Sequence, residues 1–174
     1  MRYCLKEDFV MRLRKARVFL LIVALLLIAQ TVLSFRYTGK DCCGVEGLKV
    51  RTWAPASIVM LRYGLADIRY VNQETNLRSY TYNDEQLFGR KASIEFYMSR
   101  FRAYWIRATI LEDPAGAYRE ACESIREANQ DRKGFEIRET ADGCEMGSPF
   151  GPPFFSVDLS LLDDRLVIDI TEQR

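Results

Sequence analysis

The chain has 174 residues, of which 48% are hydrophobic and 28% charged, and its 25 Lys+Arg against 24 Asp+Glu give a net charge of +1. It contains no His, which excludes Ser-His-Asp and Cys-His catalysis, His-ligated zinc and histidine phosphorelays. Residues 36–110 hold 12 basic and 7 acidic side chains, whereas residues 111–174 hold 7 and 15, so the two halves can neutralise each other when folded.

The first predicted element is an apolar helix at Val18–Phe35, which reads VFLLIVALLLIAQTVLSF and has no ionisable side chain. A helix of this length spans about 27 Å, close to the thickness of the hydrocarbon core of a bilayer. We therefore predict a transmembrane signal anchor that contacts lipid from Val18 to Phe35. A cleaved signal peptide and a buried core helix are the alternatives.

The charges beside this segment predict its orientation. Four basic residues precede it, and only two follow closely: Arg12, Arg14, Lys15 and Arg17 before, Arg36 and Lys40 after. The positive-inside rule then makes residues 1–17 a cytoplasmic tail in a single-pass protein of the plasma (bacterial inner) membrane. Residues 36–47 follow as a linker, and residues 48–174 form an extracytoplasmic domain of a size that suits one core.

Five cysteines are divided by the predicted span. Cys4 lies on the cytoplasmic side, whereas Cys42, Cys43, Cys122 and Cys144 lie in an oxidising space, where we predict structural disulfides. A bridge between the adjacent Cys42 and Cys43 would be strained, which leaves Cys42 with Cys122 and Cys43 with Cys144, or the reverse. Buried thiols, or redox or metal chemistry, are the alternatives, although the chain has no C-x-x-C motif.

The first half of the outer domain is predicted to be rich in strands. Val, Ile, Leu and aromatic residues indicate strands at Leu48–Trp53 and Ser57–Tyr63, and a hairpin formed by Asp67–Val71 and Leu77–Tyr82. A helix is predicted from about Asn83 to Ser99. Its evidence is a polar start and apolar residues at spacings of three and four, namely Leu87, Ile94, Met98, Phe101 and Trp105.

The second half begins with a predicted strand at Arg102–Leu111 and a helix at Pro114–Lys133, capped by Asp113. A strand at Phe135–Glu139 and a Gly/Pro loop at Ala141–Pro153 follow. The chain ends in a predicted hairpin whose apolar residues alternate on either side of Asp163 and Asp164: Phe155, Val157, Leu159, Leu161, Leu166, Ile168 and Ile170. The predicted fold is α+β, an N-terminal transmembrane helix followed by a small extracytoplasmic domain with a mainly antiparallel sheet and two helices.

Recognisable catalytic motifs are absent from the sequence. It has no G-x-S-x-G, S-x-x-K, P-loop or G-x-G-x-x-G pattern, so a carboxylate pair is the remaining catalytic option. Spacing selects none of the candidates, which are Glu112/Asp113, Asp158, Asp163/Asp164 and Asp169. The two pairs suit a helix cap and a hairpin turn. We therefore expect a protein that is not an enzyme and that needs no metal or cofactor.

A cluster of basic and aromatic residues gives the candidate partner-binding site. Arg100, Arg102, Tyr104 and Arg107 belong to it, and Phe150 in the segment Ser148–Phe155, SPFGPPFF, is added because prolines and aromatics in an extended loop can dock on a partner. Basic plus aromatic residues also bind single-stranded nucleic acid, but the predicted location argues against that ligand. The alternatives are a solvated surface over an aromatic core for the cluster and a rigid strand entry for the loop.

The predicted layout is a basic tail, one span and a small outer domain. In layout alone it resembles secretion-system scaffolds, periplasmic immunity proteins and phage or plasmid exclusion proteins. We therefore predict that the outer domain binds another envelope protein, as a scaffold subunit or as an inhibitor of the immunity type. The alternatives are an extracytoplasmic ligand-sensing domain and a carboxylate-dependent hydrolase of envelope carbohydrate.

Overall fold

A computed structural model describes residues 2–39, 42–132, 134–148 and 154–173. The chain divides into two units, Met1–Arg36 and Tyr37–Arg174, each described here by itself. The first unit is formed by helix α1 (Arg2–Tyr37). Within the described residues, α1 is the one helix that is long and apolar enough to cross a membrane, over Lys15–Tyr37, and its apolar side chains are exposed. That property fits a membrane span or a signal sequence.

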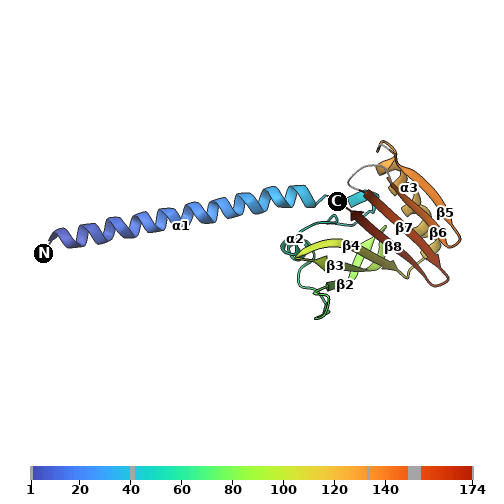
Figure 1. Ribbon diagram of the computed structural model, residues 1–174, viewed down its shortest axis with the longest axis horizontal. Coiled ribbons are helices and arrows are strands. Elements are labelled where there is room, and N and C mark those ends of the chain that lie inside the picture. The colour runs from blue at the N-terminus through green and yellow to red at the C-terminus, as the bar shows by residue number, and fades with distance from the viewer. Residues whose placement is uncertain (1, 40–41, 133, 149–153, 174) are drawn as a thin grey trace. The chain divides into compact units, whose positions relative to one another are not determined.

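The second unit is built on one eight-stranded antiparallel sheet with the strand order β1-β2-β3-β4-β8-β7-β6-β5 (Figure 1). The last strand pairs with β4, which joins a first meander, β1 to β4, to a second, β5 to β8. The strands are β1 (Ile68–Val71), β2 (Arg78–Leu87), β3 (Arg90–Ser99), β4 (Arg102–Ile110), β5 (Glu136–Thr140), β6 (Gly143–Ser148), β7 (Phe154–Leu162) and β8 (Arg165–Gln173). The predicted α+β class with an antiparallel sheet is confirmed.

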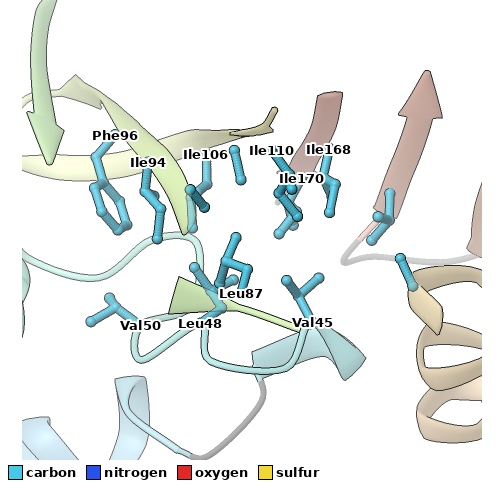
Figure 2. Close-up of a cluster of buried hydrophobic side chains, with 14 of the residues drawn as sticks. Val45, Leu48, Val50, Leu87, Ile94, Phe96, Ile106, Ile110, Ile168 and Ile170 are labelled. Atoms are coloured by element: carbon cyan, nitrogen blue, oxygen red, sulfur yellow. The ribbon is translucent and has the colours of Figure 1, made fainter. Parts of the chain in front are cut away.

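One face of this sheet carries the core. Three short elements cover it: the 3-10 turn η1 (Cys42–Gly44), α2 (Ala56–Tyr63) and α3 (Pro114–Asn129). Figure 2 shows side chains of the segment after η1 opposite those of β3, β4 and β8, and the facing residues are Val45, Leu48, Val50, Ile94, Phe96, Ile106, Ile110, Ile168 and Ile170. Each fully buried side chain of this kind contributes about 1.5–3 kcal/mol, so the burial fixes which face of every strand points inward.

The opposite face of the sheet holds the partly exposed side chains. In β3, for example, Ile94 and Phe96 are fully buried, whereas Glu95 and Tyr97 between them are half-exposed. The same alternation continues through β4 and β8. We call this surface the outer face.

Two predicted strands near the start of the domain are wrong. Ser57–Tyr63 belongs to helix α2, because Ile58 and Val59 both pack into the core from one helical side. Gly64, with φ 83°, ends this helix. Leu48–Trp53 forms no strand, although Val50 makes a single bridge to Thr38.

The predicted helix from Asn83 to Ser99 is also wrong. Strand β2 continues to Leu87, and Phe88 and Gly89, with φ of 50° and 67°, turn the chain directly into β3. Strand β6 occupies part of the predicted loop Ala141–Pro153. The first hairpin, β4, α3, β5 and the terminal hairpin are confirmed, with α3 ending at Asn129.

The segment after α1 packs as part of the second unit. The predicted linker covers residues 36–47, whereas the compact unit begins at Tyr37, which is buried. Turn η1 is held against α3 by two hydrogen bonds. Ser124 Oγ donates to the Gly44 carbonyl over 2.7 Å, and Asn129 Nδ2 donates to the Cys43 carbonyl over 3.0 Å. Both donors lie on α3, so this helix fixes the entry of the chain into the domain.

Candidate functional site

An open cleft of about 690 Å³ lies where β4 and β8 meet the loop before α2. We call it the aromatic cleft. Its lining residues come from five separate segments of the second unit and are Trp53, Leu77, Ser99, Tyr104, Trp105, Thr171 and Glu172. Three of the seven are large aromatic residues, and one is a carboxylate.

Trp53 is held in place by strand β4 and by the end of strand β8. Its backbone amide donates to the carbonyl of Ala103, and its indole Nε1 donates to the carbonyl of Glu172 over 2.6 Å. The pairing of β4 with β8 ends at Trp105 and Thr171. Beyond that pair, the loop that contains Trp53 takes the place of β8 and hydrogen-bonds to β4. The Glu172 carboxylate in turn accepts a 2.7 Å bond from Thr52 Oγ1. Backbone pairing therefore positions both Trp53 and Glu172.

A β-bulge places Tyr104 beside Trp105. The register between β3 and β4 shifts, so that Tyr97 pairs with Trp105 and Met98 with Ala103, which leaves Tyr104 as the extra residue. A bulge of this kind reorients a side chain that regular alternation would place on the other face. As a result Tyr104 and Trp105, although consecutive, are both half-exposed and both line the cleft.

Trp105 is fixed by contacts on the outer face. Its ring stacks on Tyr97 with centroids 4.3 Å apart, and its Nε1 donates to Asp169 Oδ1 over 2.8 Å. The Arg107 guanidinium lies 4.7 Å from the Trp105 ring centroid and binds both oxygens of Asp169 over 2.9 and 3.0 Å. Partial burial, with the hydrogen bond to Glu95, raises the pKa of Tyr97 to about 12, so this ring stays neutral. The Trp105 side chain is thus held through both its ring and its indole nitrogen.

The structure brings part of the predicted partner-binding set together. Tyr104 lines the aromatic cleft, and Arg107 supports it through Trp105. Arg100 and Arg102 are exposed at the turn between β3 and β4 and do not line the cleft. Phe150 lies outside the described residues. The sequence argument missed Trp53 and Glu172, which pairing alone brings to this site.

Two of the predicted disulfide cysteines meet across α3 and β6. The Sγ atoms of Cys122 and Cys144 are 3.6 Å apart, and this combination was not among the two predicted pairings. No disulfide is present among the cysteines whose side chains the structure describes, namely Cys43, Cys122 and Cys144. The side chain of Cys42 lies outside the described residues, so the predicted bridges stay predictions.

The two thiols differ in electrostatic environment. The hydrogen bond between the two sulfurs, together with the Tyr118 hydroxyl and the positive charge of Arg126, lowers the pKa of Cys122 to about 7 despite its partial burial. The same bond and burial raise the pKa of Cys144 above that of an ordinary thiol. Of the two thiols, Cys122 is therefore the one that ionises more readily.

The candidate carboxylates are dispersed, with one exception. Asp113 caps α3 and binds Arg90, and Asp164 lies in the terminal turn. Asp158 and Asp169 are direct cross-strand partners on the outer face, and burial raises the pKa of Asp158, helped by the negative charges of Glu145 and Asp169. Neither lines the aromatic cleft. Among the described residues, no group of three or more His, Cys, Asp or Glu side chains could hold a metal ion.

Comparisons of the chain with protein-family models, with curated proteins and with solved structures give no match.

Proposed function

We propose that this chain is a single-pass membrane protein of the cell envelope whose folded domain binds another protein through the aromatic cleft. The observation that carries the proposal is a set of aromatic side chains that are half-exposed and yet already immobilised. Trp53 and Trp105 each hold their indole N–H in a hydrogen bond, and Trp105 is also stacked and covered by a guanidinium.

Aromatic side chains that are already immobilised favour binding, because they lose little conformational entropy when a partner binds. Ordering a mobile side chain at an interface costs about 0.5–1.5 kcal/mol, and Trp53 and Trp105 have met that cost during folding. Trp, Tyr and Arg are also the residues that most often dominate binding energy at protein interfaces. Strand pairing extends this aromatic surface beyond the cleft. Tyr70 on β1, Ser79 on β2 and Tyr97 on β3 form one row across the sheet, and Tyr70 at the end of the row is 60% exposed.

The membrane part of the proposal is supported by α1. Its exposed apolar stretch has the length of a span, and basic residues at Arg12, Arg14, Lys15 and Arg17 precede it. We infer an uncleaved anchor in the plasma (bacterial inner) membrane, with residues 1–17 in the cytoplasm and the domain outside. The partner is then another envelope protein, which the chain serves as a scaffold subunit or inhibits as immunity proteins do.

The cleft is tested by photo-crosslinking in native membranes. The full chain carries p-benzoylphenylalanine in place of Tyr104 and, as the control, in place of Arg138, which is exposed on the edge strand β5. We expect one discrete protein adduct from position 104 and none from position 138. Tyr104→Ala should then weaken binding of the captured partner at least about tenfold, as loss of an interface hot spot does. Equal adducts from both positions, or unchanged affinity, would refute the assignment.

The membrane orientation is tested separately. Protease added to spheroplasts should remove the domain while leaving α1 in the membrane. If the domain resists the protease in intact spheroplasts and is digested only after lysis, it lies in the cytoplasm. That outcome would overturn the envelope part of the proposal and would leave the crosslinking test of the cleft unaffected.

The cleft volume favours a second candidate, a ligand-sensing domain. About 690 Å³ lies within the range of small-molecule sites, which are typically apolar with a few polar groups, here Glu172 and Thr171. This candidate predicts no protein adduct from position 104. It predicts instead a small molecule that stays bound to the full chain in native mass spectrometry and that Trp53→Ala releases. An adduct without such a bound molecule would reject it.

A further inference from the structure

The thiol pair combines features that packing alone does not require. Cys144 is 5% exposed and lies under α3, whereas Cys122 on α3 is the more exposed residue of the two. Tyr118, one helical turn before Cys122, lies close enough to both sulfurs for its hydroxyl to lower the pKa of each thiol. The three side chains form one cluster between α3 and β6, away from the residues that line the aromatic cleft.

The separation of the two sulfurs suits bond formation. At 3.6 Å they are in contact and not bonded, and a disulfide of about 2.05 Å requires them to approach by about 1.6 Å. Rotation of the two side chains about their Cα–Cβ bonds supplies movements of this size.

We propose that Cys122 and Cys144 form a dithiol that reacts with disulfide oxidants and closes an intramolecular bond between α3 and β6. Cys122 is the attacking group, and Cys144 is the resolving group. The substrate class is a reactive disulfide, either of a thiol–disulfide oxidoreductase or of glutathione. The assignment does not depend on the binding function proposed for the aromatic cleft.

The reaction takes two thiol–disulfide exchanges. The Cys122 thiolate attacks one sulfur of the oxidant RS–SR, which breaks that bond, forms the mixed disulfide Cys122–S–SR and releases RS⁻. The released thiolate takes the proton of Cys144. The Cys144 thiolate then attacks the Cys122 sulfur, forms the Cys122–Cys144 bond and expels the second RS⁻, which takes a proton from solvent. The two cysteines lose two electrons, and the oxidant gains them as two thiols.

The environment of Cys122 sets its reactivity. Its pKa is lowered to about 7, so a larger fraction of Cys122 is ionised at neutral pH than of an ordinary thiol. A thiolate of lower pKa is also a weaker nucleophile, which offsets part of this gain. The net expectation is that Cys122 reacts faster at pH 7 than the same thiol without Cys144 beside it.

The pairing has a consequence for the other cysteines. Once Cys122 and Cys144 are joined, Cys42 and Cys43 have only each other as partners within the outer domain, and a bridge between adjacent residues is strained. We therefore expect Cys42 and Cys43 to stay thiols under conditions that oxidise the pair. This outcome differs from both pairings predicted from the sequence.

The pairing is tested on the full chain in detergent micelles. The reduced protein is oxidised with glutathione disulfide, quenched with N-ethylmaleimide and digested, and the peptides are mapped by mass spectrometry. We expect the peptides of Cys122 and Cys144 to be joined with the loss of two hydrogens, and Cys42 and Cys43 to carry the maleimide. The double variant Cys42→Ser/Cys43→Ser should oxidise at an unchanged rate. Bridges from Cys42 or Cys43, or alkylation of both Cys122 and Cys144 in folded protein, would overturn the proposal.

The roles of the two thiols are tested by alkylation at the level of single peptides. The rate of iodoacetamide reaction at Cys122 should rise with pH around a midpoint near 7. Cys144→Ala should move that midpoint upward and slow the reaction at pH 7, and Tyr118→Phe should move it in the same direction by less. A midpoint that neither variant changes would show that the cluster does not activate Cys122.

Discussion

Replacement of Gly44 by Ala tests how the chain enters the domain. Gly44 lies in η1 with φ 82°, a left-handed conformation that residues with a Cβ adopt at a cost. A Cβ at this position would lie 2.7 Å from Ile125 Cα, 2.8 Å from Ala128 Cβ and 2.8 Å from the Ser124 carbonyl oxygen. These atoms belong to the backbone of α3 or are directly attached to it, so rotation of a side chain cannot relieve the overlap.

The expected loss of stability has two parts. The left-handed conformation costs about 1–2 kcal/mol for a residue with a Cβ. Overpacking against α3 adds about 1–3 kcal/mol, since η1 and the helix must separate. We expect Gly44→Ala to lower the free energy of unfolding by about 2–5 kcal/mol, a large share of the roughly 5–15 kcal/mol that holds a domain together.

Urea unfolding of the full chain in micelles measures this loss. Both tryptophans of the chain, Trp53 and Trp105, lie in the domain, so their fluorescence reports on it alone. Gly89→Ala is the matched control, because Gly89 also has a positive φ, 67°, but has no atom within 4 Å of the added Cβ. The control should show the conformational cost of about 1–2 kcal/mol without the overlap. Equal losses in the two variants would refute the docking of η1 on α3.

Three further predictions concern α3 and the outer face. Ile125→Ala should cost about 2–5 kcal/mol in urea unfolding, because Ile125 is fully buried, and a loss below about 1 kcal/mol would contradict the packing of α3. Arg90 lowers the pKa values of both Asp113 and Glu120 below their unfolded values of 3.8 and 4.5. The stability that these two carboxylates contribute is therefore present above the unfolded pKa values and is lost as the pH falls through the lower folded ones. Arg90→Gln should flatten this pH dependence in thermal unfolding between pH 7 and 2.5, and an unchanged slope would argue against the ion pairs. Burial raises the pKa of Asp158, so its contribution to stability declines as the pH rises above 3.8, and Asp158→Asn should raise the urea midpoint at pH 7, whereas a lower midpoint would contradict the assigned burial.

The sequence predicted the fold class but misassigned the segment from Asn83 to Ser99. Leu87, Ile94 and Met98 occur at helical spacings of seven and four, yet Ile94 and Met98 also fit the alternation of a strand, in which Ala92 and Phe96 are buried as well. A turn at Phe88 and Gly89 decides between the two, and a left-handed Phe is a weak sequence signal. Pairing with β2 and β4 on both sides then outweighs helical propensity.

The aromatic cleft could be predicted only in part. Tyr104 belonged to the predicted cluster, and the consecutive aromatics Tyr104 and Trp105 inside a strand already break the alternation that a regular strand requires. Trp53 and Glu172 could not be added, because their place beside Tyr104 depends on β8 pairing with β4 across more than fifty residues of chain. Strand order of this kind is set by the burial of whole faces and not by any local motif.

The thiol pair shows how an unrecognised strand hides a site. Gly143 and Gly147 indicated a loop, yet a Cβ at Gly143 would overlap the Leu159 carbonyl, so this glycine allows β6 to approach β7 closely. With the strand formed, Cys144 pairs with Leu159, and both side chains point to the core. Because α3 covers that face, the only thiol within reach of Cys144 among the described side chains is that of Cys122. The two pairings predicted from the sequence bridge every outer cysteine, and neither of them contains the contact that the structure shows between Cys122 and Cys144.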